Sequence, residues 1–267
     1  MILGIVQGLT EFLPISSSAH LVLVPHLLGW KFPAEEAFVF DVLVQVATLV
    51  AVFAYYWADV RNILTGFFIA LRQGKPFANP QARLGWFIVI GTLPAGFIGL
   101  ALKDTVEAAF NSPTATALFL FVTAALLIVA ERVGKRNKTV EGITWVDALV
   151  VGFFQAVSIF PGISRSGATM TGGMTRGLER PAAARFSFLL SMPIMLAAGL
   201  LAGKDLLAMP GLGNMLLVFI PGFIVAAITG YLAIRWLLGY LVHHSLWVFS
   251  IYCIVLASAV LIFDLLF

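Results

Sequence analysis

The sequence predicts an all-α, polytopic membrane protein: an inverted repeat of two halves, each a re-entrant helix hairpin followed by three transmembrane helices. Of its 267 residues, 61% are hydrophobic and 11% are charged, whereas about a quarter of the residues in a soluble domain are charged. One soluble core cannot cover so much apolar surface, so the bilayer must act as its solvent. The net charge of +3 does not indicate nucleic-acid binding, because the cations lie in short segments between apolar runs.

Two apolar segments, residues 1–27 and 146–174, are interrupted by helix-breaking and polar residues. The first contains Pro14 and three successive serines, and the second contains Pro161 and Gly162 followed by a Ser-Arg-Ser sequence. Such sequences survive at membrane depth only where protein or a water-filled cavity satisfies the free backbone groups. We therefore expect both segments to form re-entrant helix–loop–helix hairpins.

Six further stretches are apolar and long enough to cross about 30 Å of hydrocarbon as helices. If both termini lie outside, the segments between the stretches place twelve cations on the inner side and three on the outer side. Excess positive charge is typical of inner loops, so this orientation is the one expected. The six stretches are residues 38–58, 84–102, 114–130, 184–202, 214–234 and 247–266. The inner cations are Arg61, Arg72, Lys75, Arg83, Arg132, Lys135, Arg136, Lys138, Arg176, Arg180, Arg185 and Arg235, and the outer ones are Lys31, Lys103 and Lys204.

An offset of 148 residues aligns the two interrupted segments without a gap. The matches are Gly4 with Gly152, Gln7 with Gln155, Phe12 with Phe160, Ile15-Ser16 with Ile163-Ser164, Ser18 with Ser166, and Phe38 and Phe40 with Phe186 and Phe188. Because each half has three spans, an odd number, the second half enters with opposite topology and the hairpin tips should meet near the middle, as in secondary transporters. We expect one membrane domain, residues 1–267, with halves at about 1–130 and 146–267.

The first hairpin carries a candidate cation site. Gln7 and Glu11 are four residues apart, so they share one face of a helix. A carboxylate beside an amide oxygen suits a hard cation, and we expect Mg²⁺ or Ca²⁺ at this pair.

The loop of the same hairpin carries a candidate nucleophile. Pro14 ends the helix, so Ser16, Ser17 and Ser18 fall in the loop, where hydroxyls and backbone N–H groups are free. His20 follows within reach of that loop, and histidine is the side chain suited to proton transfer near neutral pH. The alternative for His20 is a packing histidine with satisfied hydrogen bonds.

The second hairpin carries a candidate phosphate site. Arg165 is a fixed cation whose planar fork matches phosphate oxygens, and Ser164, Ser166 and Thr169 add hydroxyl donors. A helix that restarts near Ser166 would favour an anion at its N-terminus. An arginine in the membrane interior is costly unless paired, so Arg165 is either functional or a structural partner of Glu11.

Together the motifs resemble those of the bacterial undecaprenyl-diphosphatase family, also called bacitracin-resistance proteins. They are Gln7-x-x-x-Glu11 followed by Pro14-Ile-Ser-Ser-Ser-Ala-His20, and Pro161-Gly-Ile-Ser-Arg-Ser-Gly-Ala-Thr169. The resemblance covers essentially the whole chain, including Phe186-Ser-Phe-Leu-Leu190 and Pro193.

The resemblance implies hydrolysis of undecaprenyl diphosphate to the monophosphate and inorganic phosphate, which recycles the lipid carrier for cell-wall synthesis and gives bacitracin resistance. It implies a multi-pass protein of the bacterial cytoplasmic (inner) membrane, with its site open to the periplasmic side. By position, Glu11, Ser17, His20 and Arg165 would be catalytic, with the divalent cation at Gln7 and Glu11. Many members have glutamate where this chain has Gln7, so metal affinity or the choice of base is expected to differ.

Two mechanisms and two other functions stay open. Ser17 could attack phosphorus with His20 as general base, or water could attack with His20 or Glu11 as base and Ser17 as a phosphate ligand. A flippase or exchanger for polyprenyl phosphate lipids would also suit an inverted repeat, whereas a structural scaffold leaves Arg165 unexplained. The expected partners are the polyprenyl diphosphate substrate and membrane lipids, without nucleic acid, and a homodimer is left open.

Overall fold

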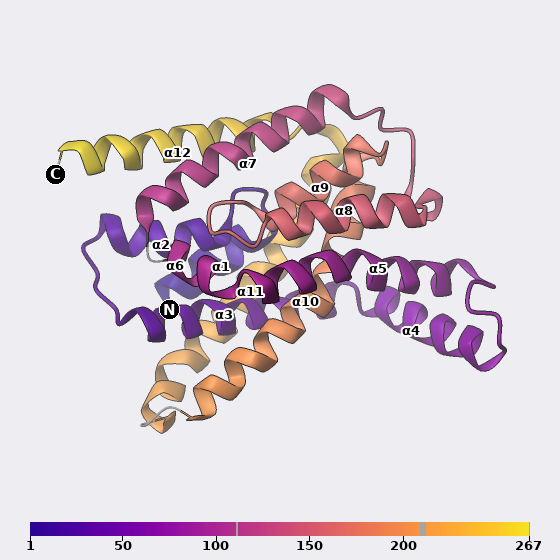
Figure 1. Ribbon diagram of the computed structural model, residues 1–267, viewed down its shortest axis with the longest axis horizontal. Coiled ribbons are helices and arrows are strands. Elements are labelled where there is room, and N and C mark those ends of the chain that lie inside the picture. Colours follow the sequence, from indigo (N-terminus) through magenta and orange to yellow (C-terminus); the bar gives the residue numbers. More distant parts are fainter. Residues whose placement is uncertain (111, 209–211, 267) are drawn as a thin grey trace.

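The structure is a computed structural model that describes residues 1–110, 112–208 and 212–266 (Figure 1). Within these ranges the chain is built from helices and contains no strand element, so the predicted all-α class is confirmed. The helices are α1 (Ile2–Phe12), α2 (Ser17–Leu27), α3 (Ala34–Tyr55), α4 (Trp57–Arg72), α5 (Pro80–Ala101), α6 (Lys103–Phe110), α7 (Pro113–Val133), η1, a 3-10 turn (Val140–Gly142), α8 (Trp145–Val157), α9 (Arg165–Thr175), α10 (Arg180–Ala208), α11 (Leu212–His243) and α12 (Trp247–Leu266).

The two interrupted segments form helix–loop–helix hairpins, α1 with α2 and α8 with α9. Helix α1 ends at Phe12 because Pro14 disfavours helical geometry at Leu13, which is extended at φ −66° and ψ 142°. Ser16 and Ser164 then cap α2 and α9, since each Oγ accepts from the backbone N–H three residues on, at 3.3 and 3.1 Å. Pro14 therefore ends α1, and the capping serines fix where α2 and α9 begin after the two loops.

Five of the six predicted spans lie on helices long and apolar enough to cross a membrane. Among the described residues these are Pro80–Ala101, Pro113–Val133, Arg180–Lys204, Ile220–His243 and Trp247–Leu266. The sixth prediction, residues 38–58, falls on α3, which has 22 residues but includes side chains outside the described part. The chain is a multi-pass membrane protein, and both termini lie toward the same end of the bundle, at the left in Figure 1.

Two regions that the sequence predicts as loops are helical. The inner connection after the first span forms α4, and α11 continues to His243 although the span prediction ends at residue 234. Arg61 and Arg235 lower the apolar average in these regions, but both side chains are exposed on the helix surface. A long charged side chain can reach solvent from a regular helix, so charge alone does not end one.

Buried carboxylates hold several of the predicted inner cations at the end of the bundle opposite the termini. Glu131 at the end of α7 accepts from Arg180 at 2.7 and 2.5 Å. Asp147 at the start of α8 accepts from Lys138 and Arg176, both at 2.8 Å. Neither carboxylate was predicted from the sequence. Their ion pairs join the ends of α7, α8, α9 and α10.

The first helix of each hairpin packs closely on a distant span through a glycine pair. A Cβ atom on Gly4 in α1 would lie 2.4 Å from the carbonyl oxygen of Gly222 in α11. A Cβ atom on Gly152 in α8 would lie 2.5 Å from the carbonyl oxygen of Gly91 in α5. Gly4 and Gly152 are matched positions of the sequence repeat, and each contacts the other half. The contacts support the inverted repeat, which stays a prediction.

Replacing Gly152 with alanine should lower the melting temperature of the protein in detergent. The added methyl group has no room beside Gly91, and overpacking costs about 1–3 kcal/mol, which exceeds the gain of about 0.5–1 kcal/mol for alanine over glycine in a helix. Gly96→Ala in α5 is the matched control, because its Cβ would meet nothing within 4 Å. Equal melting temperatures for the two variants would contradict the close approach of α8 and α5.

Candidate active site

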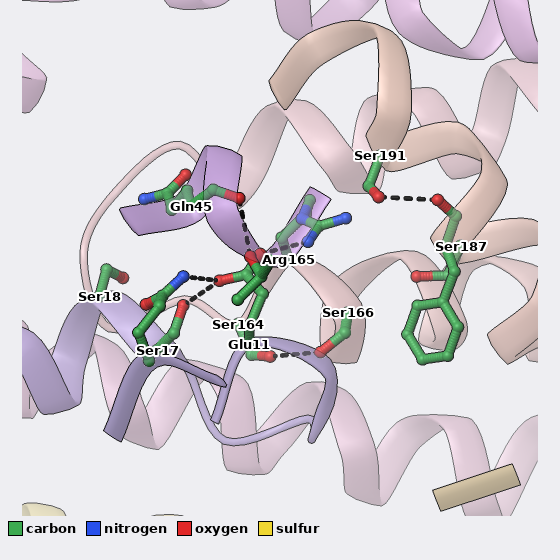
Figure 2. A network of polar contacts seen from close by, with 12 residues as sticks. Glu11, Ser17, Ser18, Gln45, Ser164, Arg165, Ser166, Ser187 and Ser191 are labelled. Carbon is green, nitrogen blue, oxygen red and sulfur yellow. Dashed lines mark hydrogen bonds and ion pairs between the residues drawn. The ribbon is translucent and has the colours of Figure 1, made fainter. Parts of the chain in front are cut away.

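The tips of the two hairpins meet inside the bundle, as the sequence predicts. Arg165 at the start of α9 forms an ion pair with Glu11 near the end of α1 (Figure 2). Two further bonds join the loops: the Gly162 N–H donates to Ser18 Oγ at 3.4 Å, and Ser166 Oγ donates to the Leu13 carbonyl at 3.1 Å. Residues about 150 positions apart are thus brought into one polar cluster.

Glu11 is the centre of this cluster. Its Oε2 accepts from Gln7 Nε2 at 2.8 Å and from Ser17 Oγ at 2.5 Å, while its Oε1 accepts from Arg165. The carboxylate side chain is 5% exposed and that of Arg165 is 14% exposed. A buried charge persists where it is paired and hydrogen-bonded, and all three partners satisfy that need. The arrangement holds the Ser17 hydroxyl against a carboxylate oxygen.

Two buried atoms beside Glu11 lack a hydrogen-bond partner among the described residues: Gln7 Oε1 and Arg165 Nη1. A buried polar group without a partner costs about 1–3 kcal/mol, so such groups are uncommon in folded proteins. One is an acceptor suited to a cation, and the other is a charged donor suited to an anion. Gln7, Ser17 and Arg165 all bond to Glu11, so these two atoms lie in one cluster with Ser17 and indicate a site for an anion and its counter-cation.

The backbone of both loops is tightly constrained. Ser16 has φ 67°, a left-handed conformation that costs a non-glycine residue of order 1–3 kcal/mol. Gly162 has φ 102°, and a Cβ atom there would lie 2.3 Å from the Thr116 carbonyl oxygen. The first loop is therefore strained at the residue before Ser17, and the second requires glycine at its tip.

His20 lies in the cluster but bonds to groups other than Ser17. Its Nδ1 contacts the Ser16 carbonyl oxygen and its Nε2 contacts Tyr252 Oη, both at 2.7 Å. A carbonyl oxygen only accepts, so Nδ1 must carry a proton, and in the neutral ring Nε2 accepts from the tyrosine. No described hydrogen bond joins His20 to Ser17, whereas Glu11 does bond to Ser17. The geometry favours Glu11 over His20 as the base.

Replacing Tyr252 with phenylalanine should lower the melting temperature of the protein but leave the pH dependence of phosphate release unchanged. The change removes the bond between Tyr252 Oη and His20 Nε2, whereas the contact to Ser17 is made by Glu11. Tyr231→Phe on α11 is the control, because no described hydrogen bond involves that hydroxyl, and its melting temperature should match the wild type. A pH profile that moves in Tyr252→Phe but not in Tyr231→Phe would instead assign the base to His20.

The remaining predicted hydroxyls form hydrogen bonds with one another or with nearby protein groups. Ser164 and Ser166 share a hydrogen bond of 3.1 Å, as do Ser16 and Ser18 in the other hairpin. Thr169 Oγ1 donates to the Arg165 carbonyl at 2.7 Å and lies 2.5 Å from Ser187 Oγ. Their predicted contact with substrate stays a prediction. In the structure they shape the loops that present Ser17 and Arg165.

Three supporting residues were not predicted from the sequence: Tyr252, Thr123 and Cys253. Thr123 in α7 donates to the Gly162 carbonyl at 2.7 Å and accepts from the Ser164 N–H at 2.8 Å. Cys253 Sγ in α12 lies 4.0 Å from the Pro14 carbonyl oxygen. Tyr252 and Cys253 are neighbours in α12 and Thr123 lies in α7, and no sequence feature assigns any of them to a hairpin loop.

Comparison with known proteins identifies the group to which this chain is related. A family model described as bacitracin resistance protein BacA matches residues 1–259. The chain belongs to this family. It is 43% identical to a protein named undecaprenyl-diphosphatase from Desulforudis audaxviator, over 100% of this chain and 97% of that protein. Proteins of the same name from Thermomicrobium roseum and Methanosphaera stadtmanae are 42% and 41% identical, over 98% of this chain and 95% and 96% of theirs.

Proposed function

We propose that the chain hydrolyses undecaprenyl diphosphate to undecaprenyl phosphate and inorganic phosphate, recycling the lipid carrier for cell-wall synthesis and giving bacitracin resistance. Family membership and the shared name of the relatives support this activity. The observation that carries it is the buried array in which Ser17 bonds to Glu11 while Arg165 keeps Nη1 free beside it. Hydrolysis needs a nucleophile, a base and a cation for the phosphoryl group, and the array supplies all three.

In the proposed mechanism Ser17 is the nucleophile and Glu11 is the base. Ser17 Oγ attacks the terminal phosphorus as its proton passes to Glu11 Oε2, 2.5 Å away. The bond from that phosphorus to the bridging oxygen breaks, and undecaprenyl phosphate leaves. Arg165 Nη1 donates to the transferring phosphoryl oxygens, where negative charge gathers. Water then attacks the phosphoserine, releasing phosphate and restoring the serine hydroxyl.

The residues at the hairpin tips fit a divalent cation. Gln7 Oε1 is buried with no hydrogen-bond partner among the described residues, and the Glu11 carboxylate lies beside it. No group of three His, Cys, Asp or Glu side chains occurs in the described part of the chain. Mg²⁺ is usually held by one or two carboxylates plus substrate phosphates, so Gln7 and Glu11 suit it, and Ca²⁺ accepts the same oxygens. When bound, the ion would neutralise charge on the diphosphate.

We place the protein in the bacterial cytoplasmic membrane with both termini outside and the site open to the periplasmic side. The support is the distribution of cations between the predicted loops. The clusters at Glu131 and Asp147 lie at the end opposite the termini, which would be the inner face.

The decisive experiment measures phosphate release from undecaprenyl diphosphate by the purified protein in detergent, with and without a chelator. We expect release that the chelator stops and that Mg²⁺ or Ca²⁺ restores. Detergent removes the two-sided membrane, so transport cannot account for release. Absence of release from folded protein in the presence of both cations would reject the proposal.

If Ser17 is the nucleophile, Ser17→Ala should lower turnover by about 10³-fold or more. Brief reaction with substrate labelled in the terminal phosphate should leave the label on Ser17 in the wild type. Ser258→Ala in α12, a serine for which no hydrogen bond is described, is the control and should retain full activity. Full activity of Ser17→Ala would instead assign the attack to water, with Ser17 as a ligand.

A flippase or exchanger for polyprenyl phosphate lipids is the second candidate. The observation that favours it is the matched packing of Gly4 on Gly222 and of Gly152 on Gly91, since interlocked repeats are the usual architecture of transporters. Transport needs an anion site but no nucleophile held against a base, so the Ser17–Glu11 bond favours the enzyme.

A further inference from the structure

Helix α4 (Trp57–Arg72) carries an exposed surface that the proposed hydrolysis does not use. It lies at the end of the bundle opposite the termini, beside the first turns of α5 (Figure 1). Asn79 Nδ2 donates to the Gly66 carbonyl at 3.3 Å, and the rings of Phe67 and Trp86 lie 5.0 Å apart. The helix is thus fixed to the protein on one side and open on the other.

The open side of α4 has an apolar stripe. Leu64, Phe68 and Leu71 follow at intervals of four and three residues, so they share one face of the helix. Their side chains are 50%, 63% and 42% exposed. A different face, with Ile63 and Ala70, is buried in the protein. Because α4 is not among the helices apolar enough to span a membrane, ordinary burial in the hydrocarbon core does not explain the stripe.

Cations border this stripe. Arg61 and Arg72 lie on the adjoining face of α4, Lys75 follows in the connection, and Arg83 lies in the first turns of α5. All four side chains are exposed. The ion pairs found among the described residues involve other cations and leave these four unpaired.

Two carboxylates near this segment share one arginine. Asp59 is the one acidic residue in the sequence between positions 57 and 83, and it pairs with Arg185. Glu141, which lines the same cavity as Arg83, lies 3.8 Å from the Arg185 guanidinium. Arg185 offsets one of these two negative charges, and the four cations of the segment exceed the other. The segment therefore presents net positive charge next to exposed apolar side chains.

We propose that this surface binds the headgroups of anionic phospholipids in the inner leaflet. The α4 lipid face is defined by Arg61, Leu64, Phe68, Arg72 and Lys75. Its stripe would enter the boundary between headgroups and acyl chains, while the cations meet the phosphates, as in interfacial amphipathic helices. The inference rests on the orientation given with the proposed function, which places this end of the bundle inside.

The test uses the full-length protein purified in detergent and stripped of lipid. Phosphatidylglycerol or phosphatidylcholine is added, and the melting temperature and the phospholipid retained in native mass spectra are measured. The variant R61Q/R72Q/K75Q removes three cations of the α4 lipid face. The matched control R132Q/K135Q/R235Q removes three exposed cations from elsewhere on the same predicted side. The phosphatase assay on the same samples reports on the hydrolysis site separately.

We expect phosphatidylglycerol, but not phosphatidylcholine, to raise the melting temperature of the wild type and the control, and high salt to weaken the effect. R61Q/R72Q/K75Q should retain at least threefold less phosphatidylglycerol while releasing phosphate at the wild-type rate. L64S/F68S should weaken retention as well. Equal retention by both triple variants would overturn the proposal. A change from dimer to monomer in R61Q/R72Q/K75Q without any lipid dependence would also overturn it, assigning the face to a second copy of the chain.

Discussion

Arg165→Lys should lower phosphate release from undecaprenyl diphosphate by about 10²- to 10³-fold, the usual effect of removing one donor to a developing charge. Lysine keeps a positive charge beside Glu11, so the buried carboxylate stays compensated. It lacks the planar fork that contacts Glu11 through Nη2 and leaves Nη1 free for a phosphoryl oxygen. Turnover by purified protein in detergent measures the effect, with thermal unfolding run on the same sample.

Arg180→Lys is the matched control for this change. Arg180 also forms a buried ion pair, with Glu131 at 2.5 Å, but it lies outside the hairpin tips. Its replacement should lower the melting temperature at least as much as Arg165→Lys while turnover of the folded protein is retained. A near-normal rate for Arg165→Lys, or equal losses of turnover in both variants, would remove Arg165 from the proposed mechanism.

The hairpins and their meeting could be predicted because the determinants are local and strong. Pro14 and the Pro161-Gly162 pair are followed by serines and lie between helices, whereas Pro25, Pro94, Pro193 and Pro221 lie inside helices. A buried arginine is costly unless it is paired, and a carboxylate in the other interrupted segment is a suitable partner. Glu11 and Arg165 are such residues, and the structure pairs them. Helix-breaking residues followed by serines, and charges within apolar sequence, therefore predicted where the hairpins lie and which two side chains pair.

The support around the site could not be predicted in the same way. Tyr252 reaches His20 across 232 positions of sequence, and the register of α12 against α2 leaves no periodic signal. Helix α4 was missed for a different reason: its cations were interpreted as those of an inner loop, although Leu64, Phe68 and Leu71 have the spacing of one helix face. Packing between helices decided the first feature, and the second was present in the sequence.

The assignment of Glu11 as the base predicts a second large loss of turnover. Glu11→Gln should reduce turnover by about 10²- to 10⁴-fold, the range attributed to a general base. Glutamine is nearly isosteric and can still accept from Ser17, but it cannot take the serine proton. It also leaves Arg165 without a counter-charge, which for buried pairs costs about 3–5 kcal/mol of stability. Turnover must therefore be normalised to folded protein, measured by thermal unfolding.

The double variant Q7E/E11Q tests whether the carboxylate must be at position 11 or only somewhere in the cluster. It returns one negative charge to the same helix face, four residues before position 11, and should restore part of the stability and the affinity for a divalent cation. It should not restore turnover, because Ser17 Oγ bonds to residue 11 and no hydrogen bond from Ser17 to residue 7 is described. Recovery of wild-type turnover would show that any carboxylate in the cluster suffices and that the Ser17–Glu11 bond is not required for catalysis.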